Sequence, residues 1–387
     1  RDTDRSRGLG DVYKRQVREP HPHLKEVKKA YQYIKCTLKD PKNLTIAIKN
    51  WYDFTNLNAY VLKWSIVGDN GKMLAKGEQS IEVAPHATTE VSLGGVRLPW
   101  NIREAYLNLS WTPKKKSAFI GTDDEVAYDQ FVLPANSQYR PTLAKLSEKP
   151  EIQIDPKTGA LTSYIYEGQE YLASPVRLSL YRPATDNDNR EKKGGAKVWR
   201  KLGLNHLVQR VLSVKTSGHT TYSEVKLLND KNDTIGSATF EYTIRKDGIL
   251  SVQTRFVPDT TFVSSLARVG LVFEMPHSFN RVTYLGRGEH ETYADRKLSG
   301  RIGIYHTDAE RMFHYYVRPQ ATGNRTDVRW MQVSDELEKG LSMWGEKPFE
   351  FSVSPFTDEN IDAAGHINEL KSCLLYTSPS PRDRSVS

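Results

Sequence analysis

The sequence of 387 residues lacks a long apolar run and a concentrated basic segment. No stretch approaches the ~20 apolar residues that a membrane-spanning helix needs. The formal net charge is +8, yet the densest basic run, Lys114–Lys116, is short and follows a proline, as a solvated loop does. Proteins that bind nucleic acid usually gather their basic residues on one face or element. We therefore expect no membrane and no nucleic acid among the partners.

Cysteine is also scarce, and one of the two cysteines lies in a terminal segment of unusual origin. Ser6–Gln16 reads SRGLGDVYKRQ and Cys373–Asp383 reads CLLYTSPSPRD. Back-translation of the first gives the second on the complementary DNA strand, as a transposase sequencing adapter would. We expect residues 1–16 and 373–387 to be non-native and exclude them from fold prediction. Cys36 is then the single cysteine, so no internal disulfide is expected and the compartment, cytoplasmic or periplasmic, stays undecided.

The remaining residues show mostly the period of two that is typical of β-strands. One short amphipathic helix is predicted in residues 17–31, where apolar side chains recur at intervals of three and four. Residues 32–134 then alternate apolar and polar side chains, and Asp69-Asn70-Gly71 is a strong hairpin signal. Several short strands with turn residues between them predict an immunoglobulin-like β-sandwich in this region.

A second strand-rich region occupies residues 151–372, after a linker at 135–150 that has no clear period. It begins with a hairpin whose turn contains Asp155 and Gly159. Within this second region, only residues 358–371 show a helical spacing. Strands and helices do not alternate anywhere, so the fold class is predicted to be all-β, with no TIM barrel.

Two aspartates and two asparagines follow one another at Asp186, Asn187, Asp188 and Asn189. A calcium loop of the EF-hand type needs a glycine at its sixth position and a glutamate at its twelfth, and this sequence has neither. A catalytic carboxylate pair is a second interpretation, although carboxylates so near in sequence need not stand ~5 to 10 Å apart across a sugar. Residue chemistry favours a third, in which these side chains bond local backbone amides in a turn. Arg190 then begins a charged segment that ends in glycines and suits a mobile surface loop.

A second cluster of charged residues lies in the stretch YLGRGEHETYADR. Arg287 can pair with nearby carboxylates, and such directional pairs orient a polar ligand or hold a loop in place. Glu289, His290 and Glu291 are a candidate acid–base set. The alternative is a histidine in a solvent-facing turn.

A third cluster, YYVRPQATGNRTDVRW, contains Arg318 and Asn324. Carbohydrate sites combine aromatic rings, which stack on sugar faces, with amide and guanidinium groups, which bond hydroxyls. Aromatic core residues and a Gly-Asn turn explain the same letters, and both interpretations stay open. His21 and His23 have no third candidate ligand nearby, so no metal site is predicted from them.

Together these segments resemble the C-terminal portion of glycoside hydrolase family 2 β-galactosidases. Residues 17–31 resemble the exit from that family's catalytic barrel, residues 32–134 its second immunoglobulin-like domain, and residues 151–372 an incomplete small-chain domain. The small chain is a β-supersandwich related to galactose mutarotase, which would here be truncated at its C-terminus. Three motifs carry the match: LYRPATDNDN against R-A-P-x-D-N-D, YLGRGEHETYADR against G-R-G-P-x-E-N-Y-x-D-R, and YYVRPQATGNR against P-Y-x-x-P-Q-E-x-G-N-R.

The motifs depart from the family pattern at two places. Glu289 stands where the family commonly has proline. Pro183-Ala184 reverses the usual Ala-Pro order, which moves the position of fixed φ by one residue. The local loop geometry is therefore expected to differ from that of the family.

The resemblance implies a bacterial enzyme that hydrolyses terminal β-galactosides with retention, of which this chain is a non-catalytic part. The catalytic glutamates and the metal ligands would lie on a barrel upstream of Val17. No catalytic residue, metal site or cofactor is therefore expected here, and Mg²⁺ and Na⁺ would belong to the missing regions. The implied partners are that barrel, a β-galactoside or other carbohydrate, and a second copy in a homo-oligomer. The segment Asp186–Arg190 would shape the rim of the active site.

Two other classes of protein stay open from the sequence. One is a free-standing carbohydrate-binding or mutarotase-like module, and the other is a structural, subunit-interface domain. The candidate carbohydrate-binding residues are Arg287, Glu289, His290, Glu291, Arg318 and Asn324. Because a truncated sandwich exposes unpaired strand edges, we also expect the chain to aggregate or to have low stability.

Overall fold

The computed structural model describes residues 20–135, 146–190, 195–260, 263, 265–372 and 375–381. These residues form two compact units. Unit 1 contains the described residues before 143 together with Leu285–Tyr305, and unit 2 contains the others. No described helix is long and apolar enough to cross a membrane. The described strands form antiparallel sheets and no α/β barrel, which confirms the all-β prediction.

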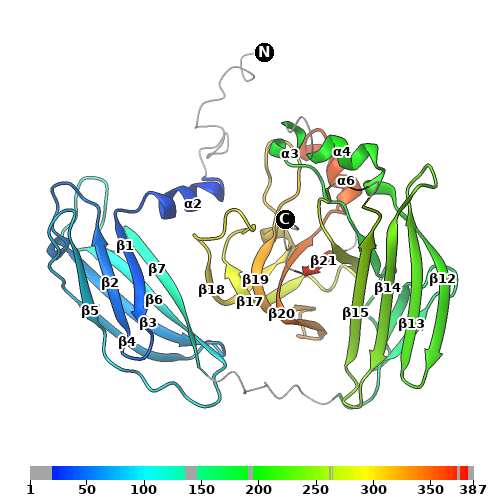
Figure 1. Cartoon of the computed structure of the whole chain (residues 1–387), viewed down its shortest axis with the longest axis horizontal. Helices are drawn as coiled ribbons and strands as arrows, with labels where there is room; N and C mark the ends of the chain where they lie inside the picture. The colour runs from blue at the N-terminus through cyan, green and yellow to red at the C-terminus, as the bar shows by residue number, and fades with distance from the viewer. Residues whose placement is uncertain are drawn as a thin grey trace. The chain divides into compact units, whose positions relative to one another are not determined.

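Unit 1 begins with a short helix, α2 (His23–Ala30), as the spacing of its apolar residues predicts. Two antiparallel sheets follow, in the orders β1-β2-β5 and β4-β3-β6-β7 (Figure 1). The predicted hairpin at Asp69-Asn70-Gly71 joins β3 to β4, with Gly71 at φ +78°. The bounds are β1 Ile34–Asp40, β2 Thr45–Asn50, η1 Leu57–Ala59, β3 Tyr60–Gly68, β4 Met73–Gln79, β5 Thr88–Ser92, β6 Glu104–Pro113 and β7 Ala127–Pro134.

The core of unit 1 is built from buried side chains of both sheets, as in a β-sandwich. Leu107, Leu109 and Trp111 alternate along β6 and are fully buried. They share one apolar cluster with Ile48 of β2. Cys36 of β1 lies in the same cluster, where burial raises the pKa of its thiol to about 12.

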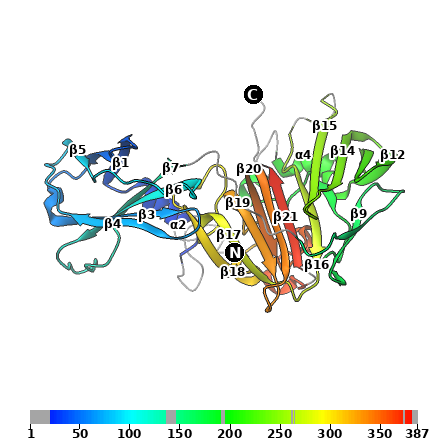
Figure 2. The same ribbon diagram turned by 90° about the horizontal axis from the view of Figure 1, so that it is seen from below.

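Unit 2 contains a three-stranded sheet, β10-β9-β8, and a four-stranded sheet, β12-β13-β14-β15. A seven-stranded sheet has the order β11-β16-β21-β20-β19-β17-β18 and includes part of the Leu285–Tyr305 segment (Figure 2). The bounds are β8 Glu151–Ile154, β9 Leu161–Tyr166, β10 Gln169–Glu170, β11 Arg177–Ser179, β12 Val208–Ser217, β13 Thr220–Leu228, β14 Thr234–Ile244, β15 Leu250–Pro258, β16 Gly270–Met275, β17 Arg281–Gly288, β18 Arg301–Asp308, β19 Arg325–Ser334, β20 Gly340–Ser354 and β21 Leu375–Pro381.

The inner face of the β12–β15 sheet is covered by the β8–β9 hairpin. This hairpin turns as predicted, with Gly159 at φ +68°. Gln209 on β12 donates from Nε2 to the Thr158 carbonyl oxygen (2.6 Å). A Cβ at Gly159 would lie 1.9 Å from Oγ of the buried Ser223 on β13. The hairpin therefore lies directly against the sheet, and a glycine is needed at the point of contact.

Unit 2 has more helices than the sequence predicts. Besides α6 (Asp358–Ala363), the structure contains short helices at α3 Asp186–Arg190, α4 Gly195–Lys201, η2 Leu204–His206 and α5 Ala309–Met312. Such segments are too short to show a helical period. The single helix predicted over 358–371 is wrong in its length, because α6 ends at Ala363 and only η3 (Ile367–Glu369) follows. Between them the Gly365 N–H donates to Glu369 Oε2 (2.8 Å) instead of continuing the helix.

The strand β21 also differs from the sequence expectation, which placed residues 373–387 outside the fold. Its backbone pairs with β16 on one side and β20 on the other. Thr377 lies opposite Phe273 and Val353. Strand pairing uses the backbone, so the position of β21 in the sheet does not depend on a particular side-chain pattern.

Candidate functional site

The Asp186–Asn189 stretch folds as the short helix α3, where the sequence favoured a turn. The Thr185 N–H donates to Asp188 Oδ2 (2.8 Å), and the Asp188 N–H donates to Thr185 Oγ1 (3.3 Å). This reciprocal pair resembles a capping box, which satisfies backbone N–H groups that the start of a helix leaves open. The local-bonding interpretation is thus confirmed for Asp188. The signal for a helix was the order Thr-x-x-Asp.

The Asp188 carboxylate also joins α3 to the irregular segment that precedes it. Arg182 donates from Nη1 to Oδ2 (2.6 Å) and from Nη2 to Oδ1 (3.2 Å). Burial alone would raise the pKa of Asp188, but the hydrogen bonds from Arg182 and Thr185 outweigh it and lower the pKa. The guanidinium of Arg182 in turn lies over the Trp199 ring, 5.3 Å from its centroid. Asp188 therefore holds the local structure through Arg182 and Thr185.

Helices α4 and α6 are tied to α3 by a second set of polar contacts, and the three helices lie together at one end of unit 2 (Figure 1). Arg200 on α4 donates to Asn189 Oδ1 (3.2 Å) and to Asp362 Oδ1 (2.8 Å). Tyr181 donates its hydroxyl to Asp362 Oδ2 (2.9 Å), and burial raises its pKa to about 12. The sequence analysis did not identify Arg200 or Asp362 as parts of this site.

The first and third sequence motifs meet at α3. The backbone N–H of Asp186 donates to Gln320 Oε1 (3.2 Å) across 134 positions of sequence. Gln320 also donates from Nε2 to the carbonyl oxygen of Arg318, an exposed residue (3.3 Å). Asn324 instead donates from Nδ2 to Glu350 Oε2 (2.9 Å) on β20. The structure thus brings Arg318 to the site, whereas Asn324 contacts a neighbouring strand.

We call this arrangement the α3 corner, defined by Asp186–Arg190, Arg200, Arg318, Gln320 and Asp362. On α3 itself, the exposed polar side chains belong to Asp186, Asn187, Asn189 and Arg190. These side chains carry hydrogen-bond donors and acceptors. The helix that bears them is held in place by the contacts of Asp188 with Arg182 and of Arg200 with Asn189. Residues 191–194, which the sequence analysis assigned to a mobile loop, lie outside the described residues.

The second motif lies in unit 1, where its charged residues hold a loop. Arg287 donates from Nη1 to the Gly300 carbonyl oxygen (2.8 Å). Glu291 has a side chain that is 1% exposed and pairs with Arg296 (2.5 Å). Glu289 is 80% exposed and lies 3.4 Å from Lys25 Nζ. These contacts support the loop-holding interpretation of Arg287 and Glu291.

The same loop is bound to the rest of unit 1 through Ser299. Glu26 on α2 accepts from the N–H groups of Leu298 (3.1 Å) and Ser299 (2.9 Å), and Tyr128 donates its hydroxyl to the Ser299 carbonyl oxygen (2.9 Å). His290 lies 2.8 Å from Ser299 Oγ through Nε2. It is half-buried and lies in a bend, so its ring is less exposed than that of a fully solvent-facing histidine. Its ring is engaged in this packing, and the geometry gives an acid–base role no specific support.

His23 lies near the same loop. Burial lowers its pKa to about 4, and the positive charge of Arg296 acts in the same direction. Glu291 and Asp295 act against this shift. Within the described residues, no three His, Cys, Asp or Glu side chains are grouped as metal ligands would be.

Comparison with known proteins identifies two matching regions. Residues 147–378 match the family described as "Beta galactosidase small chain", and residues 46–134 match "Beta-galactosidase, domain 4". A β-galactosidase of Priestia megaterium is 31% identical over 367 residues, which cover 90% of this chain and 35% of that protein. "Beta-galactosidase 2" of Enterobacter cloacae is 26% identical over 383 residues, covering 92% and 36%.

The chain thus spans about a third of the length of these curated relatives. Among solved structures, an exo-chitosanase of Amycolatopsis orientalis aligns at 9% identity and a TM-score of 0.23, over 77% of this chain and 29% of that one. A likeness of that size carries no conclusion about fold or function.

Proposed function

The chain belongs to the β-galactosidase small-chain family, and on this premise we propose that it is a non-catalytic part of a retaining enzyme that hydrolyses terminal β-galactosides. Retaining glycosidases use two carboxyl groups, one as nucleophile and one as acid and base. In this proposal both belong to an upstream catalytic barrel. The α3 corner shapes the rim of the active site and the access of the carbohydrate.

One observation carries the proposal most directly, namely the contact of Asp186 with Gln320. It joins two motifs of the family at one surface, although they are far apart in sequence. The exposed residues of α3 stand on a base fixed by Arg182 and Arg200. Polar groups held in place in this way can exclude water and orient a sugar without taking part in bond cleavage.

Because both catalytic carboxyl groups are placed on the upstream barrel, we expect that the purified chain does not hydrolyse a nitrophenyl β-galactoside. The assay is release of nitrophenol, with an intact β-galactosidase at equal concentration as the positive control. Turnover by the chain that persists through repeated purification would overturn the proposal.

A chimera tests the rim role itself. The corresponding third of the Priestia megaterium enzyme is replaced by this chain, and Asn187→Ala is introduced at the exposed face of α3. We expect KM for a β-galactoside with a bulky leaving group to rise several-fold, while kcat for a small one stays unchanged. Asn58→Ala, at an exposed position of unit 1, is the matched control. Equal kinetic constants for both variants would count against the α3 corner as a rim element.

A further inference from the structure

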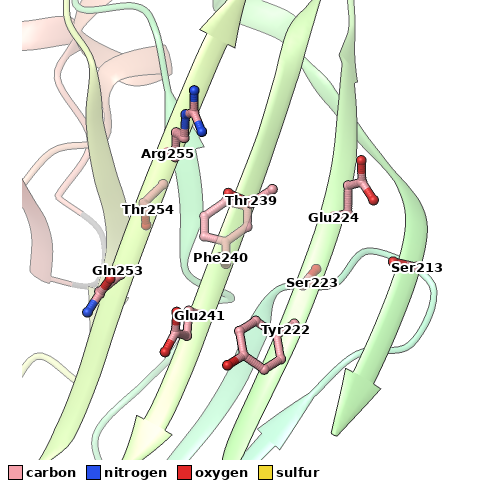
Figure 3. Close-up of a pocket in the computed structure, with 10 residues that line it drawn as sticks. All are labelled: Ser213, Tyr222, Ser223, Glu224, Thr239, Phe240, Glu241, Gln253, Thr254 and Arg255. Atoms are coloured by element: carbon pink, nitrogen blue, oxygen red, sulfur yellow. The ribbon is translucent and has the colours of Figure 1, made fainter.

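The outer face of the β12–β15 sheet carries a hollow of about 390 Å³. The opposite, inner face of the same sheet is buried, with Val225, Phe240 and Tyr242 in the core. The outward side chains of the hollow come from all four strands of this sheet. Ser213 lies on β12 opposite Glu224, and the others form two rows across β13, β14 and β15 (Figure 3). One row contains Glu224, Thr239 and Arg255, and the other contains Tyr222, Glu241 and Gln253. None of these residues belongs to the α3 corner.

The polar groups of this hollow are largely unused within the chain. No hydrogen bond or ion pair links the side chains of Glu224, Gln253 or Arg255 to another described residue. Among the described residues, Glu241 accepts only a long hydrogen bond, from Thr243 Oγ1 (3.4 Å). Tyr222 is 49% exposed, so much of this residue is accessible to solvent. The hollow therefore offers donors, acceptors and an aromatic surface together.

The register of the strands explains why the opposite charges do not pair. Glu224 and Arg255 both lie opposite Thr239, one on each side of it. Neighbouring strands are about 4.8 Å apart, so the two charged residues are roughly 10 Å apart at the backbone. Figure 3 shows the two side chains on either side of Thr239. Thr239 is exposed and lies between them, so a sugar ring placed over Thr239 would have an acceptor on one side and a donor on the other.

We propose that this hollow, formed by Tyr222, Glu224, Thr239, Glu241, Gln253 and Arg255, is a binding site for a neutral oligosaccharide. Tyr222 stacks on one sugar ring, and the carboxylates, the amide and the guanidinium bond its hydroxyl groups. The site is separate from the rim proposed above and holds a chain of sugars without cleaving it. It rests on the proposed function only for the choice of a β-galactose-containing ligand.

Charge and polarity argue against other occupants. Two carboxylates and one guanidinium line the hollow, so no excess of positive charge is present to attract a polyanion. All the outward side chains are polar except for the tyrosine ring, whereas stable protein interfaces usually have an apolar centre. A polyhydroxylated, uncharged ligand matches this lining.

The test is affinity electrophoresis of the full chain in gels that contain soluble β-1,4-galactan, followed by calorimetric titration with a galactan tetrasaccharide. We expect retardation of the wild-type chain. Tyr222→Ala should weaken binding about tenfold, since truncation of a central aromatic residue often costs more than 1 kcal/mol. Arg255→Ala should weaken it as well. Tyr31→Ala, at a tyrosine that is 78% exposed in unit 1, is the matched control and should leave binding unchanged.

The inference is overturned if the wild-type chain binds neither galactan nor a cellulose-derived tetrasaccharide, or if both hollow variants bind like the wild type. Retention with a cellulose-derived tetrasaccharide but not with galactan would change the sugar and keep the site. Tyr222 and Arg255 are exposed and lie outside the core, so both variants are expected to fold. Circular dichroism melts check this.

The chimera keeps this inference separable from the rim proposal. Tyr222→Ala in the chimera should leave kcat and KM for a nitrophenyl β-galactoside unchanged and should lower the rate on soluble galactan at subsaturating concentration. If the rate on galactan stays the same while the chimera hydrolyses normally, the hollow is not a binding site and the rim proposal stands.

Discussion

Two ionisable residues, Asp188 and His23, have lowered pKa values for different reasons. For His23 the first cause is burial, which disfavours its charged form. For Asp188 the hydrogen bonds from Arg182 and Thr185 overcome burial. In both cases the unfolded chain binds a proton more readily than the folded chain, so stability is lost as the pH falls. The pH windows differ, from 6.5 to about 4 for His23 and below 3.8 for Asp188.

His23→Gln should therefore flatten the pH dependence of unit 1. Between pH 7 and pH 5 the wild type is expected to lose about 1 kcal/mol more stability than the variant, after allowance for solvent screening. The measurement is urea unfolding followed by tryptophan fluorescence at the two pH values. An equal loss in both proteins would show that His23 is not the titrating group.

Asp188→Asn tests the connection of α3 to Arg182. This substitution keeps the shape but removes the charge that two guanidinium N–H groups share. We expect a loss of about 1–3 kcal/mol, because the bonds are charge-assisted and the carboxylate is mostly buried. Asp186→Asn, at an exposed position of the same helix, should change stability by less than about 0.5 kcal/mol. A similar effect at both positions would contradict the role given to Asp188.

At the scale of elements, the β8–β9 hairpin depends on the absence of one side chain. Gly159 and Gly168 both have positive φ, at +68° and +72°, so a substitution by alanine strains the backbone at either site. A Cβ at Gly159 would also meet Ser223 Oγ, whereas nothing lies within 4 Å of one at Gly168. Thermal melts should therefore show Gly159→Ala to be less stable than Gly168→Ala by about 1–3 kcal/mol. Equal melting temperatures would mean that the hairpin moves away at little cost.

The sequence predicted most strands, because alternation of apolar and polar residues is local and repeated. Leu107, Leu109 and Trp111 were assigned to a strand on this basis alone. The short helices α3 and α4 were missed, since seven residues or fewer carry too little pattern. The pairing of Asp186 with Gln320 was also beyond reach, because it depends on how distant segments meet. A capping box at Thr185 was the one local signal available and was interpreted as a turn.

At the scale of the molecule, β21 lies between β16 and β20 and pairs with the backbone of both, so that neither has an unpaired edge on that side. Deletion of Leu375–Pro381 leaves β16 and β20 without these backbone partners. We expect the shortened chain to aggregate at lower temperature than the full chain, since unpaired strand edges recruit other chains. Light scattering during heating measures this. Thr377→Pro, which removes one N–H from the strand, should have a smaller effect of the same sign. Unchanged aggregation in both variants would show that β21 does not protect the sheet.

Because the chain has two compact units, we expect thermal unfolding to show one transition for each unit. The core position of Cys36 offers a way to observe unit 1 alone. Its thiol is 6% exposed and its pKa is raised to about 12, so it is neither accessible nor ionised near neutral pH. In a Cys373→Ser background, the rate at which Cys36 reacts with a thiol reagent becomes a clock for the opening of that sandwich. The labelling rate of Cys36 thus reports how often the core of unit 1 opens to solvent.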